Sequence, residues 1–293
     1  MAIRDNTKFK SMYVAKEKFT ETLIRLMTEA GWEDISSLPS KDGAVMYSPG
    51  EDGNQKIHVQ ISDSYSIGST SYMMASTTTR YGGIRLLTDY TPGASGKQGT
   101  VLPAADSMIS YVIYPRAIGG NIETKLYYNI NKDRVVIINE DSFTQEGMWM
   151  YFGKPRPNYS KAYANQNLVV TGHSTRYIGK VAVLGLADTT IRTQSLGVLM
   201  THNTGKATNA KGELMLSEIG VGHNESGFIG YVDGLYTINK SFIESNNTGI
   251  RKVICGDRTL KILKCAVGVT GTSWTNTVTE IPVIAFEVEE GYE

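Results

Sequence analysis

The sequence predicts an α+β protein rich in β-strand, with one N-terminal helix and β-hairpins followed by an antiparallel β-sandwich or barrel. The composition is the first observation behind this fold class: the chain has 30 glycines, 17 tyrosines and only 20% charged residues. Glycine serves turns, whereas tyrosine suits a half-buried pleated surface. The second observation is that most apolar runs are short and bounded by Gly, Asn, Asp or Thr, which is typical of strands. We expect an N-terminal α+β domain at 1–153, a linker or long loop at 154–167 and a C-terminal β domain at 168–293.

One amphipathic helix is predicted near the start of the chain. Its apolar residues recur at helical spacing, with Lys, Glu, Thr and Arg between them: Phe19, Leu23, Leu26, Met27 and Ala30. Gly31 stands where a C-terminal helix cap belongs. The helix should bury one stripe and expose the rest.

A β-hairpin should follow, with strands at 44–47 and 56–62 joined by the turn-forming loop "SPGEDGN". Ile57, Val59 and Ile61 alternate with polar residues, which predicts one buried face. The next segment, Ser62 to Gly83, is polar and lacks periodicity, so we interpret it as a long exposed excursion.

The stretch "LYYNINKDRVVIINED" predicts a second hairpin. If Lys132 and Asp133 form a two-residue turn, one face is wholly apolar, because Tyr128 lies opposite Ile137 and Ile130 opposite Val135. The other face is half apolar and carries Tyr127, Asn129, Val136 and Ile138. This hairpin should therefore lie centrally in a sheet or form an interface. Lys-Asp is not a favoured two-residue turn, so a one-residue shift of register stays open.

Aromatic, methionine and basic residues interleave in "MWMYFGKPRPNYSKAY". Such residues are enriched at protein interfaces and in cores, and the same pattern could stack sugar rings or bases. We interpret this run and the hairpin as a subunit interface or ordinary core. The candidate interface residues are Tyr127, Val136, Ile138, Trp149, Tyr151, Phe152, Arg156 and Tyr159.

Beyond residue 167 the apolar runs suit short antiparallel strands. The segment "GDRT" should be a hairpin turn between "KVIC" and "LKILKCAV". We interpret the two cysteines, Cys255 and Cys265, as reduced, buried and apolar in character, although a pairing across neighbouring strands stays open.

No residue pattern predicts catalysis, a metal or a cofactor. The loop "TPGASGKQGT" lacks the first glycine and the hydroxyl of a phosphate loop. The four histidines are too scattered for zinc-ligand spacing, and "GHSTR" lacks the closing glycine of a nucleophile elbow. We therefore expect no enzyme activity.

The charge balance also limits the partners. The chain has 29 basic and 29 acidic residues, so nothing draws it as a whole to nucleic acid or to a membrane. The N-terminus "MAIRDNTKFK" has charges where a signal peptide is apolar, which predicts synthesis in the cytoplasm.

Several segments together resemble virion structural proteins of tailed bacteriophages over about half the chain. In the N-terminal part these are "AGWEDISS", "DGAVMYSPGEDGNQKIHVQI" and "YYNINKDRVVIINED". A similar C-terminal module contains "GFIGYVDGLYTIN", "VICGDRTLKILKCAV" and "VIAFEVE". The resemblance implies a non-enzymatic subunit of the tail, baseplate or neck/collar, made in the bacterial host and bound to its own copies and to neighbouring virion proteins. It assigns no functional residues. The alternative is a carbohydrate or host-surface binding module that uses Trp149, Tyr151 and Tyr159.

Overall fold

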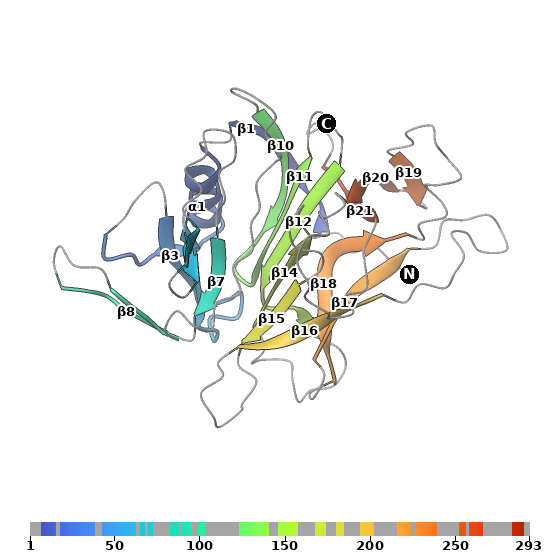
Figure 1. The fold of residues 1–293 in the computed structure, drawn as a ribbon. Coiled ribbons are helices and arrows are strands. Elements are labelled where there is room, and N and C mark those ends of the chain that lie inside the picture. The colour runs from blue at the N-terminus through green and yellow to red at the C-terminus, as the bar shows by residue number, and fades with distance from the viewer. Residues whose placement is uncertain are drawn as a thin grey trace.

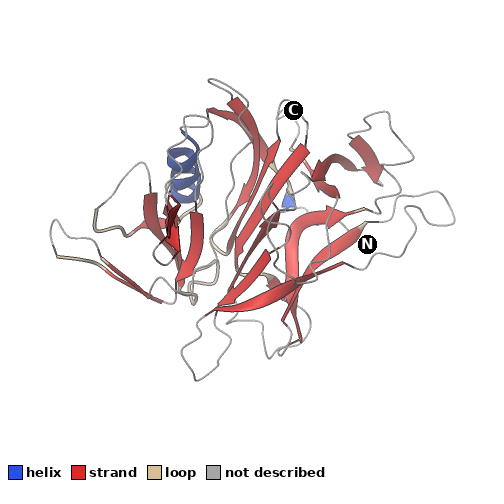
Figure 2. Cartoon of the chain, in the orientation of Figure 1, coloured by secondary structure: helices blue, strands red, loops and turns tan. Residues whose placement is uncertain are grey.

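In the computed structural model, the described residues form one α-helix and 21 β-strands. Strands dominate this part of the chain (Figure 2). The residues described are 7–15, 18–38, 43–62, 65–67, 70–72, 83–87, 89–94, 99–102, 123–140, 146–157, 168–173, 180–184, 194–201, 216–223, 227–238, 252–255, 258–265 and 283–289. The predicted β-rich α+β class is confirmed. None of the helices in these ranges has the length and apolar character that crossing a membrane requires.

The helix α1 (Phe19–Glu29) forms as predicted and buries Phe19, Leu23, Leu26 and Met27. Its C-terminus is a Schellman motif, in which the amides of Gly31 and Trp32 donate to the carbonyls of Thr28 and Met27, both at 3.0 Å. Gly31 has a φ of 92°. The motif needs this left-handed conformation, which explains the glycine after the helix.

A four-stranded sheet lies beside the helix, in the order β2-β3-β4-β7 (Figure 1). Its strands are β2 (Glu33–Asp34), β3 (Gly43–Ser48), β4 (Ile57–Ser62) and β7 (Gly83–Leu87). The antiparallel pairing of β3 with β4 confirms the predicted first hairpin. Ile57, Val59 and Ile61 are buried, as their alternation predicts.

The largest described sheet has 13 strands. Twelve of them follow the order β1-β10-β11-β12-β14-β15-β16-β17-β18-β21-β20-β19. Its N-terminal strands are β1 (Lys10–Ala15), β10 (Glu123–Ile130), β11 (Arg134–Glu140), β12 (Glu146–Gly153) and β13 (Arg156–Pro157). The strands after residue 167 are β14 (Leu168–His173), β15 (Lys180–Leu184), β16 (Gln194–Thr201), β17 (Ser217–His223), β18 (Gly227–Thr237), β19 (Lys252–Cys255), β20 (Arg258–Cys265) and β21 (Val283–Glu287). Strand β13 pairs with β18, and the first residues of β12 pair in parallel with β20.

The second hairpin has the predicted register. Tyr128 lies opposite Ile137, and Ile130 lies opposite Val135. The amide of Asn131 donates to the carbonyl of Arg134 at 3.0 Å, which closes the two-residue turn. The side chain of Asn131 accepts hydrogen bonds from the amides of Asp133 and Arg134, both at 3.0 Å. This local acceptor compensates for a dipeptide that does not favour the turn by itself.

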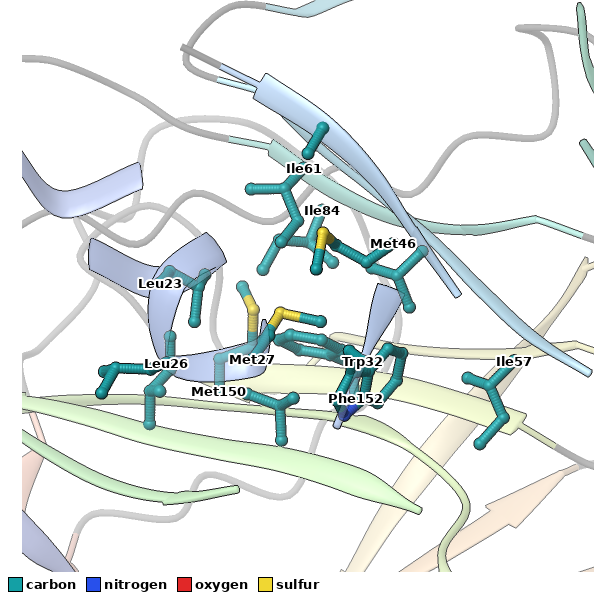
Figure 3. Packing of buried hydrophobic residues seen from close by; sticks show 14 of the residues in the cluster. Leu23, Leu26, Met27, Trp32, Met46, Ile57, Ile61, Ile84, Met150 and Phe152 are labelled. Carbon is teal, nitrogen blue, oxygen red and sulfur yellow. The ribbon is translucent and has the colours of Figure 1, made fainter. Parts of the chain in front are cut away.

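Strands β10, β11 and β12 form a layer that is buried on both faces. One face joins an apolar cluster with α1 and the small sheet; Leu23, Met46 and Met150 converge there (Figure 3). The opposite face packs against β17, β18, β20 and β21 through a second cluster that contains Tyr127, Trp149 and Phe286. The hairpin therefore lies centrally in the sheet, which is one of the two positions that its sequence predicts.

Two short hairpins form small sheets of their own. Strands β5 (Tyr65–Ile67) and β6 (Thr70–Tyr72) pair within the segment interpreted as an exposed excursion, and most of that segment lies outside the described residues. Strands β8 (Asp89–Thr91) and β9 (Thr100–Leu102) form the other, which extends away from β3 and β7 (Figure 1).

The division into domains 1–153 and 168–293 stays a prediction. Within the described residues, β12 pairs with β14, and the second apolar cluster takes residues from both ranges. In the predicted linker, β13 is ordered on β18, while residues 158–167 lie outside the described residues.

Strands β19 and β20 pair antiparallel with Cys255 opposite Arg258, as the predicted hairpin requires, while Gly256 and Asp257 of the "GDRT" segment lie outside the described residues. Cys265 is buried in the second apolar cluster. The burial agrees with the expected apolar character of Cys265, whereas its reduced state stays a prediction.

Candidate functional site

Most candidate interface residues are interior side chains. Tyr127, Val136, Ile138, Trp149 and Tyr151 lie in the second apolar cluster, and Phe152 lies in the first. All six are at most 1% exposed. Of the two interpretations that the sequence left open, the structure therefore places these six in the core, where this conformation leaves them no contact with a partner. Arg156 is partly buried in a charged cluster, and Tyr159 lies outside the described residues.

The charged cluster consists of Arg134, Arg156, Glu218 and Asp233, and it joins strands that are far apart in the sequence. Arg134 Nη2 lies 3.1 Å from Asp233 Oδ2, and these side chains are 4% and 13% exposed. Arg156 pairs with Glu218 through Nη2. Two cations thus face two carboxylates between β11, β13, β17 and β18, so the charges balance inside a largely buried site.

Arg156 connects the two acidic residues of this cluster. Its Nε lies 3.4 Å from Asp233 Oδ1, which is an ion-pair contact without hydrogen-bond geometry. Its guanidinium carbon lies 4.5 Å from the centre of the Tyr231 ring, so the cation also stacks on an aromatic face. Arg134 is held further by Asn129, whose side-chain oxygen accepts from Nη1 at 2.5 Å.

Two glycines allow the backbones around this cluster to approach closely. A Cβ on Gly153 would lie 2.4 Å from the carbonyl oxygen of Asp133, and a Cβ on Gly230 would lie 2.5 Å from that of Arg156. Gly153 also has a φ of 117°. These positions bring the end of β12 against the β10–β11 turn and allow β13 to lie on β18.

The β10–β11 turn is itself a contact point for the first part of the chain. Trp32 donates through Nε1 to the Asn131 carbonyl at 2.8 Å, and the Ser48 hydroxyl donates to the Lys132 carbonyl at 2.6 Å. The amide of Glu51 donates to Asp133 Oδ1 at 3.0 Å. These bonds fix the turn against the helix C-terminus and the β3–β4 loop.

The tyrosines beside the charged cluster are kept protonated. Burial is the main cause that raises the pKa of Tyr151 well above its ordinary value, and its hydroxyl donates to the Lys154 carbonyl at 2.5 Å. Burial also raises the pKa of Tyr236, with Asp233 and Glu218 adding to the effect. Both hydroxyls are therefore poor proton donors near neutral pH.

A second polar group lies where β20 meets the β10–β11 hairpin. Glu140 accepts a hydrogen bond from the Tyr127 hydroxyl and contacts Lys261 Nζ, each at 2.8 Å. The Lys261 ammonium lies 4.8 Å from the centre of the Tyr127 ring. This arrangement again pairs a buried carboxylate with a cation and a hydroxyl, so the charge of Glu140 is compensated inside the fold.

Neither polar group has the composition of a catalytic or metal centre. Within the described ranges, no three His, Cys, Asp or Glu side chains are grouped so that they could hold a metal ion. In both groups the acidic side chains already contact cations, so neither presents an unpaired general base. The expectations of no catalytic, metal or cofactor residue stay predictions, because much of the chain lies outside the described residues.

Sequence reasoning missed three members of the charged cluster. Arg134, Glu218 and Asp233 sit at or near apolar strand runs, in "DRVVII", "SEIGVG" and "GYVDGLY". A charge inside a buried strand signals a partner, because an unpaired buried charge is costly. That signal marks each residue, but it cannot say which of the charges meet.

No protein-family model matches the chain, and no curated protein matches it.

Proposed function

We propose that this chain is a non-enzymatic structural subunit of a tailed-phage particle, in the tail, baseplate or neck/collar. It acts by binding its own copies and neighbouring virion proteins, is made in the host bacterial cytoplasm and ends in the virion. The resemblance of its hairpin segments to phage virion proteins supports the proposal. Two of these segments cover the β3–β4 and β10–β11 hairpins, which carry the central layers of the fold.

The observation that carries the assembly mechanism is the character of the two outermost strands in the long sheet. Strand β1 begins the pairing order and β19 ends it. Tyr13 on β1 is 64% exposed and Ile254 on β19 is 77% exposed. Leu38 is the third and last exposed large apolar residue of the described part of the chain. Apolar side chains on outermost strands favour association with another chain.

The proposal also includes an architecture for the C-terminal β domain. We infer that its strands wrap around the second apolar cluster as a sandwich or barrel. The pairing order supports this, because it runs from β12 through β14 to β18 and then through β21 to β20, which pairs with β12 again. A rigid module of this kind suits a particle subunit, because its interface can form without reordering the core.

The alternative sugar-binding platform lacks support from Trp149 and Tyr151, while its third aromatic residue, Tyr159, lies outside the described residues. Trp149 and Tyr151 are both 0% exposed. A sugar ring needs an exposed aromatic face for stacking, so a carbohydrate function would have to rest on other residues.

The test measures the mass of the full chain in solution by light scattering over a wide concentration range. We expect a closed ring, or a mass that grows with concentration. Tyr13→Lys and Ile254→Lys should each shift the protein toward monomer by at least several-fold in the association constant, because a charge is then desolvated at the contact. Leu38→Lys is the matched control, because Leu38 is 49% exposed but lies outside the large sheet.

The proposal fails if the wild-type chain stays monomeric at high concentration and does not co-purify with particles. If all three lysine variants weaken association equally, the oligomer forms but the strands β1 and β19 do not mediate it.

A further inference from the structure

Among the described residues, the β8–β9 hairpin and the loop after β8 contact the small sheet and its β2–β3 connection through Tyr90 and the Gly93 amide. This amide donates to the Ser37 hydroxyl at 2.6 Å. Tyr90 packs against Val45 and Leu87 in a separate apolar cluster. The Tyr90 hydroxyl accepts a hydrogen bond from the Ser37 amide at 3.0 Å and lies 2.8 Å from the Ser37 hydroxyl. The described apolar cluster here has three buried residues, far fewer than the two large clusters, so separating it costs less.

His58 borders this attachment. In the small sheet it lies between Tyr47 on β3 and Leu87 on β7, its two register partners. Its neighbours Ile57 and Val59 point into the first apolar cluster, so the alternation of the strand places His58 on the same outer face as Leu87. His58 is 7% exposed, and its Nδ1 atom has no hydrogen-bond partner.

The groups around His58 favour its neutral form. Burial lowers the pKa of His58 from its ordinary value of 6.5; the Asp89 carboxylate opposes this and Lys56 adds to it. On β3, the centre of the Tyr47 ring lies 5.0 Å from the centre of the imidazole ring, and the two ring planes are at 40° to each other. This ring supplies no charge. Asp89 is the first residue of β8. The base of the hairpin therefore adjoins a histidine whose burial outweighs the attraction of Asp89.

We propose that His58 is a proton-operated latch for the β8–β9 hairpin: neutral His58 keeps the base of the hairpin closed on the small sheet, and protonation favours its release. Opening lets water reach the imidazole, so the open form binds a proton more readily than the closed form. The closed form is fully stable above pH 6.5 and loses stability as the pH falls below that value. The equilibrium constant for opening rises by at most about tenfold per pH unit, until the lowered pKa of the closed form is reached.

The test is hydrogen exchange of the full chain, read by mass spectrometry at pH 7.5 and 5.5 and corrected for the intrinsic rates. Peptides from residues 89–102 report the hairpin, and β11 is the internal reference. In the wild type we expect protection of the hairpin to fall several-fold at pH 5.5 while β11 is unchanged. His58→Gln, which cannot take up the proton, should show the same hairpin protection at both pH values.

Tyr90→Phe separates the anchor from the latch. It removes the hydroxyl that contacts Ser37, so the hairpin should lose protection at both pH values and keep the pH dependence. Equal wild-type protection at the two pH values would overturn the proposal, even if His58→Gln failed to fold. A His58→Gln variant that loses as much protection at pH 5.5 as the wild type would also overturn it.

Discussion

At the scale of single residues, Gly153 shows how one position fixes the contact between two strands. It ends β12, has a φ of 117°, and faces the backbone of Asp133 and Arg134. A side chain there would meet backbone atoms, which cannot rotate away as a flexible side chain can. The glycine therefore serves both its conformation and the close approach.

Replacing Gly153 with alanine should lower the free energy of unfolding by about 3 kcal/mol or more, because left-handed strain and overpacking add. Gly53→Ala is the matched control: Gly53 has a φ of 71°, but nothing lies within 4 Å of its added Cβ. That control should cost only about 1–2 kcal/mol, which is the conformational part alone. Urea unfolding of the two variants measures the difference, and equal losses would contradict the role of the close approach.

At the scale of elements, β11 combines an unusual sequence with an unusual position. All seven of its residues are buried, although an antiparallel strand often has one solvated face. Val135 and Ile137 point into the first cluster, whereas Val136 and Ile138 point into the second. The run "VVII" is thus protected from aggregation because a layer covers each face.

Ile137→Ala and Ile138→Ala should each lower the free energy of unfolding by about 2–5 kcal/mol, because each leaves a cavity in a different core. Both isoleucines are 0% exposed. Leu38→Ala is the control, and it should change stability by less than about 1 kcal/mol, because Leu38 is 49% exposed and lies outside both cores. Chemical unfolding measures all three, and a near-neutral result at either Ile137 or Ile138 would contradict a strand buried on both faces.

At the scale of the whole molecule, apolar clusters bring the layers into contact, and buried ion pairs connect the same layers. The pair of Arg134 with Asp233 joins β11 to β18 across 99 residues of sequence. Buried pairs contribute little net stability compared with apolar packing, but breaking one leaves an uncompensated charge.

Arg134→Met should therefore cost about 3–5 kcal/mol in the free energy of unfolding, because Asp233 keeps only the longer contact with Arg156. Arg25→Met is the control: its pair with Glu29 on α1 is about half exposed, at 49% and 57%, and should contribute less than about 1 kcal/mol. Thermal and urea unfolding measure both variants. A loss for Arg134→Met no larger than that for Arg25→Met would show that the buried pair is dispensable.

The two predicted domains, 1–153 and 168–293, share one apolar core. The second apolar cluster takes Tyr127 and Trp149 from the first range and Ile219 and Phe286 from the second. Two separately stable domains would unfold in two transitions, whereas a shared core favours one. The unfolding experiments above also distinguish these outcomes.

The sequence by itself determined the local features of this protein. The spacing of Phe19, Leu23 and Met27 defined the helix, alternation defined the β3–β4 hairpin, and the two-sided apolar pattern of residues 126–141 required cover on both faces. These features were predictable because helix and strand periods are properties of neighbouring residues.

Only the tertiary structure decided what covers those faces and which charges meet. Residues such as Trp149 and Tyr151 are common both at interfaces and in cores. They are buried by β17, β18, β20 and β21, which are strands more than 60 residues away in the sequence. Likewise, Arg134 and Arg156 each mark a buried charge, but their sharing of Asp233 follows from the packing of β11 and β13 on β18. The physical reason is that hydrophobic burial is not directional, so a pattern states how much surface must be covered and not by which partner.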